Sequence, residues 1–95
     1  MSDSEQVLRE GIRNVVGEVL RVTLDPAQDD LPLTTLYEQY DSLAVIDSVG
    51  GVEKRTGVVI DLVEDDLRVT FASVTSILRL VQRKQAAASV LESGF

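Results

Sequence analysis

The chain has 95 residues, enough for one small domain, and it contains neither cysteine nor histidine. Disulfides and thiolate metal sites are therefore excluded, and the commonest general base of enzymes and the commonest zinc ligand are missing. The formal net charge of −7 disfavours nucleic acid and anionic membranes as partners, and no segment has the pattern of a membrane span or a leader, so we expect a cytoplasmic monomer.

The negative charge is concentrated in the middle of the chain. Residues 25–66 contain 11 acidic and two basic residues, a net charge of −9, whereas the rest of the chain carries +2. Such a segment attracts basic protein surfaces, but it is also typical of a segment that only keeps the protein soluble. The charge distribution therefore leaves both interpretations open.

The first half of the chain is predicted to form one helix and one long loop. Over residues 4–22, apolar residues recur at three- and four-residue intervals and give one apolar face. Ser2 with Glu5 is a candidate capping box for this helix, and Asp3 and Ser4 are alternative caps. Residues 23–40 contain both prolines and three aspartates, which indicates a loop that is functional or contains a short helical turn.

A second helix is predicted to begin at Asp41 or Ser42 and to end at about Arg55. Asp41 is a favourable N-cap residue, and Gly57 is typical of the residue that follows a helix. Two adjacent glycines inside the helix indicate either close packing against another helix or a soft point.

The remaining elements are shorter, apart from the last helix. The β-branched residues 58–60 are predicted to form an extended connector, and residues 64–68 a short helix. Ser73 is expected to cap a final helix, and the alanine-rich stretch 86–95 either prolongs this helix or forms a disordered tail. The elements predict an all-α fold: a small four-helix bundle of three main helices and one short helix, with a long first loop and a domain spanning residues 1–85.

One tripeptide, Asp41-Ser42-Leu43, stands at the start of the second helix. By itself it is typical of a helix cap. Its context is more specific, because it follows the long loop and is followed by Ala44-Val45-Ile46-Asp47 and then by Gly57. The stretch 36–57, together with Phe71-Ala-Ser-Val74 before the last helix, resembles the acyl and peptidyl carrier protein family. The resemblance covers residues 7–84.

The resemblance implies a function for Ser42. In that family the serine of the motif carries 4′-phosphopantetheine, attached covalently from coenzyme A by a phosphopantetheinyl transferase. The thiol of this arm holds acyl or aminoacyl groups as thioesters for loading and processing enzymes, which fits a chain without cysteine. The chain would thus be a freestanding, non-catalytic carrier, of polyketide, nonribosomal peptide or other specialised metabolism rather than of housekeeping fatty acid biosynthesis.

The same resemblance implies a partner-binding surface, for which we expect the residues Asp41, Leu43, Ile46, Asp47, Asp61 and Glu64. Two of these residues have a second interpretation. Asp41 is also a helix cap, and Leu43 could equally belong to the core.

The chain departs from the family pattern before the serine. Gln39 replaces a common glycine, and Tyr40 replaces a common leucine or phenylalanine. We expect Tyr40 to bury its ring and keep its hydroxyl in water. The second helix also carries fewer acidic residues than that of a typical fatty acid carrier.

Two alternatives to a carrier remain from the residues alone, and a calcium site is not one of them. Asp61, Glu64, Asp65 and Asp66 lack the ligand spacing of a calcium-binding EF-hand loop, which favours a solvated, helix-capping cluster. An unmodified acidic helical adaptor that binds a basic protein is the second candidate function, and a carrier that has lost its modification belongs with it. A small enzyme is the third, disfavoured by the missing histidine and cysteine and by the lack of a suitable carboxylate pair.

Overall fold

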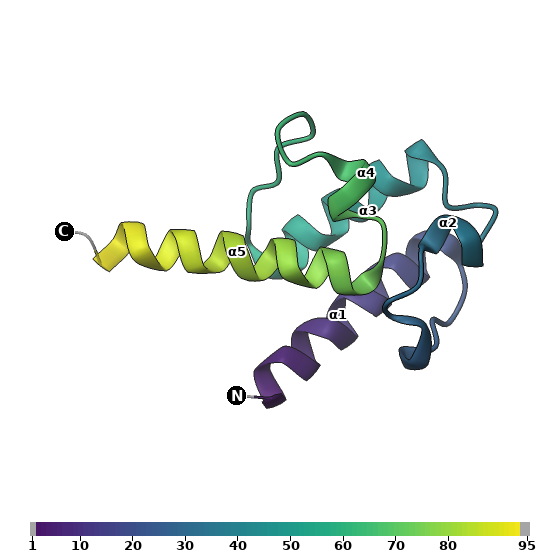
Figure 1. Ribbon diagram of the computed structural model, residues 1–95, viewed down its shortest axis with the longest axis horizontal. Coiled ribbons are helices and arrows are strands. Elements are labelled where there is room, and N and C mark those ends of the chain that lie inside the picture. The colour runs from purple at the N-terminus through teal and green to yellow at the C-terminus, as the bar shows by residue number, and fades with distance from the viewer. Residues whose placement is uncertain (1, 94–95) are drawn as a thin grey trace.

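Helices make up the regular secondary structure of the computed structural model, which describes the backbone of residues 2–93 and the side chains of residues 4–87 (Figure 1). The elements are α1 (Ser2–Leu20), the 3-10 helix η1 (Pro26–Gln28), α2 (Leu33–Leu36), α3 (Ser42–Thr56), α4 (Leu67–Thr70) and α5 (Val74–Ser93). No strand occurs among the described residues, so the predicted all-α class is confirmed. The expected capping box includes the Ser2 side chain, which lies outside the described residues.

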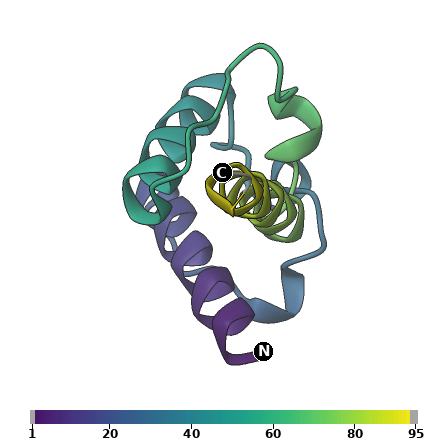
Figure 2. The same cartoon turned by 90° about the vertical axis from the view of Figure 1, so that its left-hand side faces the viewer.

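The three long helices pack around a shared apolar core. Helix α1 packs against α3 and α5, and α4 packs against α5. Figure 2 looks nearly along α5 and shows α1 and α3 on one side of it and α4 on the other. Residues 86–93 continue α5, whose C-terminal part extends beyond the other helices (Figure 1). None of the helices in the described part of the chain is long and apolar enough to cross a membrane.

Helix α1 follows its apolar pattern but ends at Leu20, two residues earlier than predicted. Its buried face includes Ile12 and Leu20. The helix stops because Arg21 adopts a left-handed backbone conformation with φ 59°. The N–H of Val22 then donates to the carbonyl of Gly17 at 3.0 Å, which satisfies one of the free carbonyls at the helix end.

The predicted first loop contains η1 and α2 and is joined to the segment that links α4 with α5. Leu33 is buried, whereas Leu31 is exposed. Hydrogen bonds to backbone carbonyls connect the two segments: the Thr75 N–H donates to the Asp29 carbonyl (3.1 Å), the Leu33 N–H to the Ala72 carbonyl (2.8 Å), and the Tyr40 hydroxyl to the Phe71 carbonyl (2.5 Å). The long loop is therefore fixed along its length by residues 71–75.

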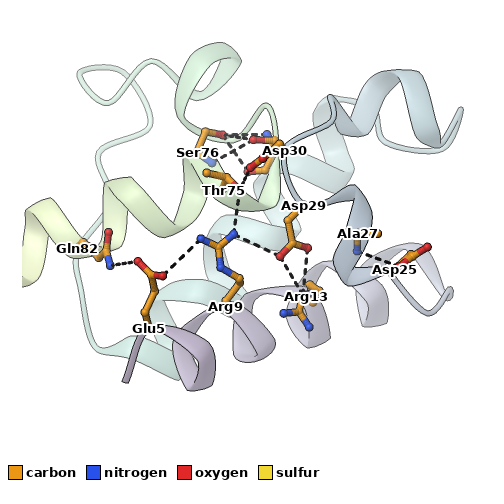
Figure 3. A network of polar contacts seen from close by, with 11 residues as sticks. Glu5, Arg9, Arg13, Asp25, Ala27, Asp29, Asp30, Thr75, Ser76 and Gln82 are labelled. Carbon is orange, nitrogen blue, oxygen red and sulfur yellow. Dashed lines mark hydrogen bonds and ion pairs between the residues drawn. The ribbon is translucent and has the colours of Figure 1, made fainter. Parts of the chain in front are cut away.

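A buried carboxylate anchors the same loop to α1 (Figure 3). Asp29 is 6% exposed and lies between two arginines of α1. Nε of Arg13 lies 3.1 Å from Oδ1 of Asp29, and Nη1 of Arg9 lies 3.3 Å from Oδ2. Arg9 also donates to the Thr75 hydroxyl at 3.0 Å, and this hydroxyl donates to Asp30. The network thus connects α1, the first loop and the start of α5.

Replacing Asp29 tests how much this network contributes to the free energy of unfolding. Asp29→Ala removes the carboxylate between two largely buried guanidinium groups: Arg13 loses its ion pair, and Arg9 keeps only Glu5 at 3.8 Å. We therefore expect the free energy of unfolding to fall by about 3 kcal/mol. Urea unfolding followed by circular dichroism measures the change. Asp30→Asn is the matched control, since it keeps an oxygen for the Thr75 hydroxyl and should change stability by less than about 1 kcal/mol. Equal effects of the two substitutions would contradict a special role for Asp29.

Helix α3 lies close to α1 at one of its two adjacent glycines. A Cβ atom added at Gly51 would lie 2.6 Å from Cγ1 of Val15, which is buried and β-branched and therefore has little freedom to move. A Cβ added at Gly50 would have no atom within 4 Å. The interpretation as close packing against another helix therefore holds for Gly51. It does not hold for Gly50, which faces open space.

These neighbouring glycines form a matched pair for mutation. Gly50→Ala should raise the free energy of unfolding by about 0.5–1 kcal/mol, because alanine favours the helix and meets nothing. Gly51→Ala should lower it by about 1 kcal/mol or more, because overpacking against Val15 outweighs the gain in helix propensity. The midpoints of thermal or urea unfolding measure both changes. A stabilising Gly51→Ala substitution would show that α1 and α3 are not in this contact.

The connection between α3 and α4 differs in one respect from the prediction. Residues 58–60 form an extended connector, as expected. The short helix, predicted over residues 64–68, instead spans Leu67–Thr70, because Asp61 and Asp65 engage the preceding backbone in turns. The Asp61 carboxylate accepts hydrogen bonds from the N–H groups of Val63 and Glu64, both at 2.8 Å, and Asp65 accepts one from the Asp61 N–H at 2.7 Å.

Candidate functional site

Ser42 is the first residue of α3, and the residue before it caps the helix. Asp41 has an extended backbone conformation, and its carboxylate accepts a hydrogen bond from the Ala44 N–H at 2.9 Å. Ser42 is exposed. Capping is therefore performed by Asp41, and the Ser42 hydroxyl is left accessible at the positive end of the helix dipole.

The far end of α3 is also set by its sequence. Gly57 adopts a left-handed conformation with φ 78°, and its N–H donates to the Glu53 carbonyl at 2.8 Å. Lys54 and Arg55 lie in the last turn, where positive charge is favourable. The predicted helix and both of its end signals are thus present.

Apolar side chains next to Ser42 on α3 are open to solvent. Leu43 is 67% exposed and Ile46 is 50% exposed, and Asp47 is exposed beside them. Residues three and four positions apart lie on one face of a helix, so Leu43, Ile46 and Asp47 share a surface near the serine. The interpretation of Leu43 as a core residue is wrong.

Tyr40 differs from its expected position. Only 4% of the residue is exposed, and its hydroxyl donates to the carbonyl of Phe71 instead of remaining in water. Burial raises the pKa of Tyr40 well above its ordinary value, because the phenolate would lose its hydration. The hydroxyl finds its partner 31 positions away, a contact that no local pattern indicates.

A groove of about 380 Å³ opens beside Ser42. Helix α3 contributes Val45 and Ile46 to its lining, and the segment around α4 contributes Leu67 and Phe71. The groove is therefore mostly apolar. A larger hollow of about 690 Å³ follows α1 and is lined by several charged side chains, but it does not include Ser42.

One cation lies on this groove. Arg68 is 94% exposed and pairs with Asp66 at 3.5 Å, an exposed ion pair that contributes little stability. Sequence reasoning did not identify Arg68 or Leu67 as part of the site. Both residues lie on α4, but only the tertiary fold, in which α4 packs against α5, brings them to the groove beside Ser42.

The two acidic residues predicted from the second loop lie elsewhere. Asp61 and Glu64 are exposed, and neither lines the groove beside Ser42. Asp61 is engaged by the turn described above, and Asp65 pairs with Lys84 of α5 at 2.8 Å. This loop also exposes Val59, Leu62 and Val63, so it forms a separate acidic and apolar surface.

No protein-family model, curated protein or solved structure gives a significant match to the chain. The resemblance to carrier proteins therefore depends on the residues of the motif and on the elements that position them.

The ion pair between Asp65 and Lys84 predicts a dependence of stability on pH. The Lys84 ammonium lowers the pKa of Asp65, and backbone N–H groups of Glu64 and Val63 lower that of Asp61, both below the ordinary value of 3.8. A carboxyl with a lower pKa in the folded state stabilises the fold above its unfolded pKa and loses this effect as pH falls through the folded value. The protein should therefore lose stability as the pH falls below about 5 and through the lowered pKa values of these two carboxyls.

Lys84→Met should weaken that acid dependence and lower stability at neutral pH by less than about 1 kcal/mol. Arg79→Met removes one positive charge from an exposed position on the same helix and is the control. Urea unfolding at a series of pH values compares the two variants. Identical pH profiles would contradict the assignment of the ion pair.

Proposed function

We propose that the chain is a freestanding carrier protein that holds acyl or aminoacyl groups as thioesters on a 4′-phosphopantetheine arm attached to Ser42. The observation that carries the proposal is the accessible Ser42 hydroxyl at the start of α3, next to an aspartate that already caps the helix. In this proposal the fold is a small four-helix bundle, in which α1, α3 and α5 are the main helices and α4 is the short one. The carrier domain spans residues 1–85.

The residues around Ser42 fit the group that the proposal requires. An attached phosphodiester would lie at the positive end of α3, and Arg68 on the adjacent groove supplies a positive charge. The apolar lining of the groove suits the aliphatic part of such an arm. The arm would supply the reactive thiol, which this chain lacks. The protein itself has no catalytic part in the proposal: it anchors the cargo and raises its effective concentration at each partner.

The proposed partners are a phosphopantetheinyl transferase and the enzymes that load and process the cargo. Leu43 and Ile46 offer apolar contacts beside the serine, and Asp41 and Asp47 offer negative charge. Asp61 and Glu64 belong to the separate surface of the loop between α3 and α4. They would contact a partner only if it covers this loop as well as the surface beside Ser42. We propose a cytoplasmic monomer that acts in polyketide, nonribosomal peptide or other specialised metabolism.

An unmodified acidic adaptor is the second candidate. The exposed side chains of Val59, Leu62 and Val63, which lie among acidic residues, favour it, because a partner with a basic rim and an apolar centre would suit this loop. Binding of such a partner would weaken with salt and would not change in Ser42→Ala.

Modification of Ser42 tests the proposal. Incubation with coenzyme A, Mg²⁺ and a broad-specificity phosphopantetheinyl transferase should add one arm to the protein, seen as a single step in intact mass. Ser42→Ala should abolish the gain, because among the residues whose side chains the structure describes Ser42 alone follows a capping aspartate at the start of a helix. Ser4→Ala removes an exposed serine from the first part of α1 and should be modified like the wild type.

Two results would overturn the proposal. The absence of any mass gain in the wild type would argue against a carrier and favour the adaptor. A gain that persists in Ser42→Ala would show that the arm is attached elsewhere.

A further inference from the structure

The groove beside Ser42 is small and mostly apolar. Its volume of about 380 Å³ is near the lower limit of ligand pockets, which run from roughly 300 to 1,000 Å³. Val45 and Ile46 come from α3, and Leu67 from α4, so apolar surface lines the space next to the serine. A group held there would lose water from its apolar part while its polar end stayed near the groove opening.

Two buried rings of the helical core line this groove. Tyr40 is 4% exposed and Phe71 is completely buried, and both line the groove. Their side chains thus form its floor, and the core residues Ile77 and Leu78 do not line it.

A hydrogen bond fixes this floor. The Tyr40 hydroxyl donates to the Phe71 carbonyl at 2.5 Å and thereby joins the residue before Asp41 to the end of α4. Displacing Tyr40 would leave a buried carbonyl and a buried hydroxyl without partners, which is unfavourable. An apolar chain entering from the side of Ser42 therefore meets a floor that resists displacement.

We propose that Tyr40 determines the specificity of the groove for short acyl or small apolar aminoacyl groups. This inference rests on the proposed function of Ser42. Short groups lie between α3 and α4, and the hydrogen bond from Tyr40 to Phe71 prevents longer chains from extending into the core. Long chains stay in water or on a partner enzyme.

Chain length is the variable that tests this inference. A broad-specificity transferase attaches acyl-pantetheine arms to Ser42 directly from acetyl-, butyryl-, hexanoyl-, octanoyl- and dodecanoyl-coenzyme A, and intact mass confirms loading. The rate of thioester hydrolysis, relative to that of the same acyl-pantetheine free in solution, measures protection by the protein. Each methylene that enters the groove should increase protection by up to about fourfold. In the wild type we expect protection to stop increasing at a chain length shorter than octanoyl.

Variants of Tyr40 should move this plateau. Tyr40→Phe keeps the ring and loses the hydrogen bond, and Tyr40→Leu also removes part of the floor, so both should extend protection to octanoyl and dodecanoyl. Tyr37→Phe is the control, because Tyr37 is half-buried and does not line the groove. It should reproduce the wild-type profile.

The outcomes separate this inference from the proposed function. Failure of the wild type to accept any arm on Ser42 overturns both. Normal loading with protection that rises through dodecanoyl, or with no protection at any length, overturns the length limit alone. An unchanged plateau in Tyr40→Phe and Tyr40→Leu overturns the role of Tyr40. If Tyr40→Leu does not fold, the profiles of the wild type and Tyr40→Phe decide the question.

Discussion

The carboxylate of Asp29 holds the long first loop of this protein between two helices that are distant in sequence. Arg9 and Arg13 of α1 neutralise it, and the backbone carbonyl of the same residue accepts the N–H of Thr75 at the start of α5. A carboxylate with so little access to water is tolerable only while its charge is neutralised, and both arginines donate hydrogen bonds to its Oδ2. Asp29 alone thus attaches the loop both to α1 and to the start of α5.

Further along, the loop is attached to the same part of the chain by Leu33 and Tyr40, which bond to Ala72 and Phe71. These contacts hold the segment before α3 against the end of α4, and residues of both helices line the groove beside Ser42. Asp41 then caps α3, and Ser42 follows it with an exposed hydroxyl. The accessible serine and the groove next to it are therefore products of the same three attachments. A carrier function and a limit on cargo length would both depend on them.

Local sequence signals predicted the parts of the fold that local physics controls. The apolar stripe of α1, the cap at Asp41, and the stop at Gly57 are all present, because each depends on residues within a few positions. The helical class followed from these signals. The start of α4 was shifted, since turns built on aspartate carboxylates replaced the helix that its composition favoured. The exposure of Leu43 could not be decided from a stripe that fits either interpretation.

Local sequence signals could not predict the contacts that position the site. Asp29 and Arg13 are 16 positions apart, and Tyr40 and Phe71 are 31 apart, so neither pair leaves a periodic pattern. For the same reason, the motif predicted Ser42 as the attachment site but did not predict the groove beside it. Whether Ser42 carries the proposed phosphopantetheine arm can be read from the intact mass of the protein isolated from cells that produce it, with mapping of the modified peptide. We expect the mass of one arm, with or without cargo, on the peptide that contains Ser42. An unmodified mass, under conditions in which the cells make active transferase, would contradict it.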